Sequence, residues 1–329
     1  MRITQTTLAI AAASAALSLT LTACGGAAPA NQPTAGAGGA GGVEIKVGLI
    51  PVAEFFPVYV AEDQGFFDEA GLNVSVESMS NAASIVPSVL NGQLSIGTAA
   101  TPPFLTAVEK KIPVTAVANA GNTSSVEGED TGAFVVGSDS GITSPSGLEG
   151  KTVAVNALSS LPHVAAVARI AADGGNPDAV RFVAMPFTDM LTALEQKRVD
   201  AILPVEPFMS QSLEAGGTSI SPLYTGVYPA GTTHTLYFAS QNFAAENPEA
   251  LAGFREAIAK ANELISKDQA VLRKALVEHG GMPEATAETV NLPAYETDFN
   301  LEGMKDMAAK MKDNGFLTTD VDVEASILK

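Results

Sequence analysis

The stretch Leu94–Leu105, LSIGTAATPPFL, decides the fold class. A short apolar run ends at Gly97, small residues follow, and two prolines open an apolar helical pattern. This is the layout of a strand, a turn and a helix. The same alternation recurs from Val43 onward, which predicts βαβ units, a mostly parallel sheet and an α/β fold.

The predicted elements fall into two blocks of alternating strands and helices. Strands are expected in VEIKVGLI (43–50), LNVSVESM (72–79), LSIG (94–97), IPVTAVANA (112–120), KTVAV (151–155), AVRFVAM (179–185), DAILPV (200–205) and HTLYFAS (234–240). Helices are expected over 57–71, 82–92, 102–111, 162–175 and 188–198 and in a run from 248 to 317. The second block interrupts the first, which predicts two lobes with a cleft between them. We assign 43–135 plus 236–329 to lobe 1 and 136–235 to lobe 2, with hinge strands at 134–136 and 235–238.

The N-terminus is predicted to be a secretion signal. The apolar run Leu8–Leu21 is too short to cross a hydrocarbon layer of about 30 Å as a helix, but suits a signal peptide. It ends in LTAC, Leu21–Cys24, which resembles the bacterial lipobox. We therefore expect a lipoprotein signal peptide at 1–23, lipidation of Cys24, and a lipid-anchored flexible linker at 24–42 rich in Gly, Ala and Pro. An ordinary cleavage site with an incidental cysteine is the alternative.

Composition argues against several classes of partner. The 329 residues carry 36 acidic and 18 basic side chains, a formal net charge of −18. Nucleic acids and anionic lipid surfaces require a basic footprint, so neither is expected as a partner. The single cysteine excludes an internal disulfide and a cysteine-rich metal site. His163, His234 and His279 are far apart in sequence, and we expect neither a metal nor a cofactor.

Four helices are predicted to begin at a proline: Pro57, Pro102, Pro162 and Pro207. Small or hydroxyl-bearing residues precede several of them, so a ligand could approach the main chain closely. Unpaired amides and the helix dipole make such a terminus an anion site without Lys or Arg. This interpretation gives LSIGTAATPPFL a binding role through its main chain. Ordinary strand-to-helix turns are the alternative.

The order and spacing of several segments resemble the nitrate/sulfonate/taurine-type solute-binding proteins of ABC importers. The segments are VGLIPVAEFFPVYVAEDQGFFDEAGL, GQLSIGTAATPPF, LEGKTVAVN, RVDAILPVEPF and ASQNFAAENPEAL. The resemblance runs from about Glu44 to Leu317. It implies a two-lobed, type II periplasmic-binding-protein-like fold with a hinge and a central cleft, located outside the cytoplasm. It also implies a monomer that closes over one small molecule and docks on membrane permease subunits.

The resemblance also assigns ligand-binding positions by motif. They are Ala53, Glu54, Phe55 and Phe56 after the first strand, Thr98, Ala99, Ala100 and Thr101 after the third, and Asn156, Ser159, Ser160 and Glu206 in lobe 2.

The ligand class stays open at this stage. A small organic anion is expected, either a sulfonate, a taurine-like molecule or an aromatic carboxylate. If Glu54 or Glu206 faces the ligand, a molecule with an N–H group, such as a pyrimidine vitamin precursor, becomes the alternative. We expect Glu206 to cap a neighbouring helix instead. Arg169 and Arg181 are the arginines that could reach the ligand. An enzyme on the same fold and a protein-docking lipoprotein are the remaining alternatives, and we expect no catalytic residues.

Overall fold

The computed structural model describes residues 42–79, 82–124, 126 and 128–329. The predicted signal peptide, Cys24 and all of the predicted linker except Gly42 lie outside these residues. In the part of the chain that is described, no helix combines the length and apolar character needed to span a membrane.

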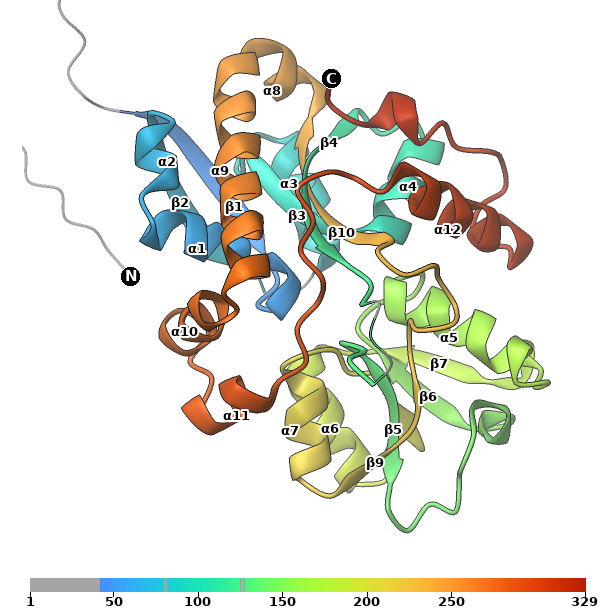
Figure 1. Ribbon diagram of the computed structural model, residues 1–329. Helices are drawn as coiled ribbons and strands as arrows, with labels where there is room; N and C mark the ends of the chain where they lie inside the picture. The colour runs from blue at the N-terminus through green and yellow to red at the C-terminus, as the bar shows by residue number, and fades with distance from the viewer. Residues whose placement is uncertain (1–41, 80–81, 125, 127) are drawn as a thin grey trace, which may run out of the picture. The chain divides into compact units, whose positions relative to one another are not determined.

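Two five-stranded sheets form the framework (Figure 1). The first has the order β2-β1-β3-β10-β4, and its strands are β1 (Val43–Leu49), β2 (Leu72–Ser78), β3 (Ile96–Ala100), β4 (Val114–Asn122) and β10 (Thr233–Ser240). The second has the order β7-β6-β8-β5-β9, and its strands are β5 (Ala133–Gly137), β6 (Thr152–Val155), β7 (Arg181–Ala184), β8 (Ala201–Ile202) and β9 (Gly217–Pro222). Strands β1, β2 and β3 pair in parallel, as do β6, β7 and β8, whereas β10 and β5 pair antiparallel with their neighbours. The predicted α/β class is therefore confirmed.

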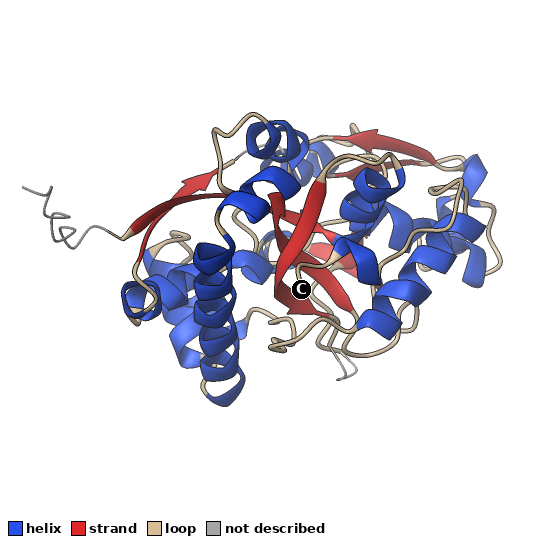
Figure 2. Cartoon of the chain, turned by 90° about the horizontal axis from the view of Figure 1, so that it is seen from above, coloured by secondary structure: helices blue, strands red, loops and turns tan. Residues whose placement is uncertain are grey.

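Helices lie on both sides of the strands (Figure 2). The α-helices are α1 (Pro57–Asp63), α2 (Phe66–Glu69), α3 (Ile85–Leu90), α4 (Thr101–Glu109), α5 (Leu161–Ala172), α6 (Phe187–Glu195), α7 (Phe208–Glu214), α8 (Gln241–Glu246), α9 (Pro248–Lys267), α10 (Ala270–Glu278), α11 (Glu284–Thr289) and α12 (Leu301–Asp313). Short 3₁₀ turns are η1 (Ala53–Phe55), η2 (Ala82–Ser84), η3 (Pro145–Leu148), η4 (Pro177–Ala179) and η5 (Glu324–Ser326). In the first sheet β4 and β10 are buried along their whole length, because elements cover both of their faces.

The structure differs from the predicted elements at two places. The single helix expected over 57–71 is divided into α1 and α2 at Gly65, which has a left-handed φ of 74°. Strand β9 was not predicted, since its sequence GTSISP is only partly buried and carries no continuous apolar run. It forms the edge of the second sheet, where such a pattern is tolerated.

The described chain connects the two sheets at three places, which we call passages; the third is an excursion out to α11 and back (Figure 1). The first two passages are the segments 123–132 and 223–232, which join β4 to β5 and β9 to β10. They are bound to each other by Leu223 N–H on the Gly132 carbonyl at 3.0 Å and Gly231 N–H on the Thr123 carbonyl at 3.0 Å. The predicted hinge strands, 134–136 and 235–238, lie inside β5 and β10. The predicted lobe boundaries after 135 and 235 accordingly fall inside those two strands.

The third passage was not predicted. Helix α11 contacts α7 of the second sheet, and an extended segment then returns to α12 against the first sheet. Asn122 bridges to this segment: its backbone exchanges two hydrogen bonds with Ala294, at 2.7 and 3.1 Å. Residues 284–291 therefore do not belong with the first sheet alone, although we assigned all of 236–329 to one lobe.

The fully buried side chain of Asn122 holds the passages together. Its amide donates to the Gly231 carbonyl at 2.9 Å, and its oxygen accepts from the Asn119 amide at 2.7 Å and from Glu296 N–H at 3.4 Å. We expect Asn122→Ala to lower the free energy of unfolding by about 2 kcal/mol, since it leaves buried polar partners without hydrogen bonds. Urea unfolding measures this change. The exposed Asn242→Ala should stay within about 0.5 kcal/mol of the wild type, and equal effects of the two substitutions would contradict the assignment.

Candidate functional site

A cavity of about 230 Å³ lies at the carboxyl ends of the parallel strands of both sheets. The first sheet contributes residues that follow β1, β2 and β3, and the second contributes residues that follow β6, β7 and β8. Lining residues are Ile50, Val52, Glu54, Phe55, Ala82, Ala83, Val86, Thr98, Ala99, Ala100, Pro103 and Thr235 on the first side, and Asn156, Ala157, Leu158, Ser160, Leu161, Pro162, Phe187, Val205 and Tyr224 on the second. In open α/β sheets this edge is where ligands bind.

Seven of the twelve predicted ligand-binding residues line this cavity. They are Glu54, Phe55, Thr98, Ala99, Ala100, Asn156 and Ser160. Five do not: Ala53, Phe56, Thr101, Ser159 and Glu206. Neither Arg169 nor Arg181 lines it; Arg169 donates to the carbonyl of Thr225 in the second passage instead.

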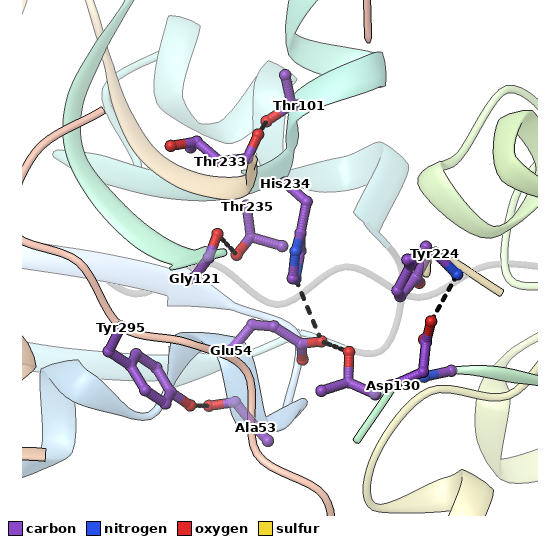
Figure 3. Close-up of polar contacts among 12 residues, drawn as sticks. Ala53, Glu54, Thr101, Gly121, Asp130, Tyr224, Thr233, His234, Thr235 and Tyr295 are labelled. Atoms are coloured by element: carbon purple, nitrogen blue, oxygen red, sulfur yellow. Dashed lines mark hydrogen bonds and ion pairs between the residues drawn. The ribbon is translucent and has the colours of Figure 1, made fainter. Parts of the chain in front are cut away.

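Two buried tyrosines hold the turn that carries Glu54. Tyr295 donates its hydroxyl to the Ala53 carbonyl at 2.9 Å, and Tyr237 donates to the Phe55 carbonyl at the same distance. Figure 3 shows Tyr295 on Ala53 beside the Glu54 side chain. Ala53 therefore has a structural role, because it is buried outside the cavity lining and its main-chain carbonyl is anchored by Tyr295.

The Glu54 carboxylate is only 3% exposed. Its Oε1 accepts from the Thr131 hydroxyl at 3.1 Å, and His234 Nε2 lies 3.6 Å from the same oxygen (Figure 3). Its Oε2 has no hydrogen-bond partner among the described residues. The side chain is thus fixed through one oxygen while the other is left unsatisfied.

Asp130 positions Tyr224, an aromatic cavity residue that the sequence did not indicate. The Asp130 carboxylate accepts from the main-chain N–H groups of Gly132, Tyr224 and Thr225 at 3.0, 2.8 and 2.6 Å (Tyr224 is drawn in Figure 3). The Tyr224 ring stacks on His234 with centroids 5.5 Å apart. One carboxylate therefore connects the first two passages and sets one wall of the cavity.

The predicted turn at 98–101 is wrong. Strand β3 continues to Ala100, where Thr98, Ala99 and Ala100 pair with Tyr237, Leu236 and Thr235 of β10. Helix α4 begins directly at Thr101, whose hydroxyl donates to the Thr233 carbonyl at 2.9 Å rather than capping the helix.

The same geometry weakens the interpretation of this stretch as a main-chain anion site. Proline has no N–H, so Pro102 and Pro103 remove two of the free donors that the first turn of α4 would otherwise offer. At the start of α5, Pro162 removes another. The first turns of α4 and α5 therefore offer fewer main-chain donors than the sequence interpretation assumed.

Ser159, in the turn after β6, is hydrogen-bonded to a side chain of the following helix, α5. It adopts a φ of 60°, and its N–H donates to His163 Nδ1 at 2.8 Å. Burial lowers the pKa of His163 to about 4, which keeps the ring neutral and able to accept this bond at pH 7. Ser160 instead lines the cavity, and its hydroxyl has no partner among the described residues.

Glu206 caps α7, as expected, and does not reach the cavity. Its Oε2 accepts from Ser210 N–H at 3.0 Å, and its Oε1 accepts from the Ser210 hydroxyl at 2.9 Å and from Asn291 N–H at 3.2 Å. Burial raises the pKa of Glu206 to about 7, and these hydrogen bonds oppose that rise. The Glu206–Pro207 peptide is cis, and Pro207 precedes α7 instead of starting it.

The aromatic residues near the strand ends divide between the cavity and the core. Phe55 and Phe187 line the cavity, and Phe187 stacks on Phe208 with centroids 5.5 Å apart. Phe56 is buried next to Tyr59, which explains its absence from the cavity. Phe104 is likewise a core residue.

One group of possible metal ligands lies outside the cavity. Asp63, Glu278 and His279 each offer a ligand atom within 4.8 Å of the others, and all three side chains are exposed. Sequence spacing did not indicate this group, because α1 and α10 meet only in the folded chain. His279 already binds Asp63 at 3.0 Å and stacks on Tyr59.

The two sheets, their three passages and the cavity at the strand ends define the fold of the periplasmic solute-binding proteins. The chain belongs to the NMT1/THI5 like family, whose model matches residues 52–272. A search of curated protein sequences gives no match.

Several solved structures share the fold at low sequence identity. The alkanesulfonate-binding protein SsuA of Xanthomonas axonopodis pv. citri, bound to MOPS, is 16% identical with a TM-score of 0.73, covering 87% of this chain and 98% of that one. The periplasmic nitrate-binding protein NrtA of Synechocystis PCC 6803 is 15% identical with a TM-score of 0.70, covering 86% and 84%. The desulfurization enzyme DSZB is 13% identical with a TM-score of 0.65, covering 87% and 96%, so the fold also carries enzymes.

Proposed function

We propose that this protein is the extracytoplasmic solute-binding component of an ABC importer. It holds one small organic molecule between its two sheets and presents it to the permease subunits of the membrane. The single observation that supports this most strongly is the cavity at the strand ends, to which both sheets contribute. A molecule bound there touches both halves, so binding favours the closed arrangement.

The three passages suit such a closure. In the described part of the chain, the two sheets are joined by the segments 123–132 and 223–232 and by the excursion through α11, with the connections on either side of that helix. A few loop residues that absorb backbone rotation are the usual form of a hinge. We propose that these segments, rather than β5 or β10, are the hinge.

The sequence before residue 42 supports an anchor at the membrane. LTAC at Leu21–Cys24 follows a signal-like apolar run and precedes a stretch rich in Gly and Ala. Lipidation of Cys24 would tether the binding domain, acting as a monomer, to the outer face of the membrane near its permease.

The cavity lining favours binding over catalysis. Most of its residues are apolar, and Glu54 is the titratable carboxylate among the described lining residues. The same lining includes neither histidine nor cysteine, the side chains most used as bases and nucleophiles. SsuA and NrtA, which share the fold, are binding proteins by their descriptions.

A thermal-shift screen tests this function. Protein freed of bound molecules by unfolding and refolding should gain Tm with one class among sulfonates, aromatic carboxylates and pyrimidine amines. A ligand at 100 times its Kd stabilises the folded state by about 3 kcal/mol, since it binds only that state. Chemical turnover of the stabilising compound, or no shift across the whole screen, would contradict the proposal.

A further inference from the structure

We infer that the ligand carries a positively charged, N–H-bearing group that pairs with Glu54, attached to a flat and largely apolar body. The inference rests on the proposed function and specifies its substrate class. It departs from the anions that the descriptions of SsuA and NrtA name, and from the organic anion expected from the sequence.

The first step is the unsatisfied oxygen of Glu54. Buried carboxylate oxygens in folded proteins nearly always accept hydrogen bonds, because desolvation is costly without them. Thr131 and His234 both lie on the Oε1 side, whereas Oε2 lacks a partner among the described residues. Since Glu54 lines the cavity, a donor on the ligand is the group that would satisfy it.

The second step concerns the other polar atoms of the lining. Asn156 Oδ1 and Ser160 Oγ also lack partners among the described residues, and both belong to the opposite side of the cavity. A side-chain amide can turn either way and a hydroxyl donates or accepts, so these two groups suit many ligands. The sign of the preferred charge is therefore set by Glu54.

The third step is the distribution of positive charge. Neither lysine nor arginine occurs among the described residues that line the cavity. Arg169 is bound to the Thr225 carbonyl, and Arg181 lines a separate surface depression with Asp189 and Arg198. Within the lining, a sulfonate or carboxylate would thus meet the buried Glu54 carboxylate with neither lysine nor arginine to pair with, which is unfavourable. The ionisable neighbour of Glu54, His234, lies outside the lining and on the Oε1 side. The formal net charge of −18 also draws cations toward the chain and repels anions.

The flat, apolar body of the ligand is inferred from the remaining residues that line the cavity. Phe55, Phe187 and Tyr224 present aromatic side chains, and Ile50 and Leu161 are among the aliphatic ones. Such surfaces bind planar rings by stacking and by burial of apolar area. An aromatic amidine or a protonated amino-heterocycle combines both features in a molecule that suits a cavity of about 230 Å³.

Four probes of matched size and shape test the inference by isothermal titration of the refolded protein at pH 7.5 and low salt. They are benzamidinium, benzamide, benzoate and benzenesulfonate. We expect benzamidinium to bind at least about tenfold more tightly than either anion, because a charge-assisted bond to a buried carboxylate is among the stronger hydrogen bonds. Glu54→Gln should remove that preference. The affinity for benzamide, which is neutral, should change by no more than about threefold on this substitution.

Glu77→Gln is the matched control, since Glu77 is an exposed carboxylate on the same sheet. It should leave the ranking unchanged. Benzoate or benzenesulfonate binding as tightly as benzamidinium would overturn the charge assignment while the proposed function stands. Absence of binding by all four probes would overturn it too, and the proposed function is then judged by the thermal-shift screen. Should Glu54→Gln fail to fold, as seen by circular dichroism, the wild-type ranking decides alone.

Discussion

Ala157→Trp is expected to abolish ligand binding, with a loss in affinity of at least about 100-fold, while the fold is retained. Ala157 lies in the turn after β6 and lines the cavity, where an indole would occupy the space of a small ligand. Inserting an aromatic ring into a filled site forces displacement of either the ring or the ligand. Isothermal titration with the compound found by the screen measures the loss.

Ala172→Trp is the control for this substitution. Ala172 ends α5 in the same half of the molecule, is exposed, and does not line the cavity. It should bind the ligand like the wild type. Equal affinity of Ala157→Trp and Ala172→Trp would show that the ligand binds elsewhere.

Stability should fall with rising pH through the titration of Glu206. Its pKa is raised by burial to about 7 in the folded protein, above its ordinary value of 4.5. Between these values the folded chain holds a proton that the unfolded chain has released. The contribution of this bound proton to the free energy of unfolding is therefore complete below pH 4.5 and is lost as the pH rises through 7. The difference in pKa corresponds to about 3 kcal/mol.

Glu206→Gln isolates this contribution, because glutamine stays neutral and keeps the shape. Relative to the wild type, its free energy of unfolding in urea should rise by up to about 3 kcal/mol between pH 4.5 and 8. Parallel pH dependences for the two proteins would contradict the assignment. Since Glu206 also accepts from Asn291, its ionisation acts where the third passage meets α7.

Much of the fold could be predicted because apolar periodicity is a local signal. The parallel strands, the helices between them and the edge where they end follow from alternation along the chain. The partly buried β9 and the passage around Asn291 could not be predicted, because each depends on contacts between distant segments. The break at Gly65 has a local cause, the left-handed φ of a glycine inside a helical pattern.

Some residues of the site could likewise be predicted from the sequence, and others could not. Glu54, Asn156 and Ser160 stand directly after predicted strands, so their place at the cavity could be predicted. Tyr224 lies in no such position and is placed by Asp130, far away in sequence. That Glu54 would be buried with one oxygen unsatisfied also depends on Thr131 and on the tyrosines that hold its turn.

Native mass spectrometry tests capture in the cavity most directly. Refolded wild-type protein and Ala157→Trp are each incubated with a small-molecule extract, and the masses of the intact complexes are recorded. We predict that the wild type retains one molecule of a single compound per chain and that Ala157→Trp retains none. Retention of the same compound at equal occupancy by both proteins would contradict the account.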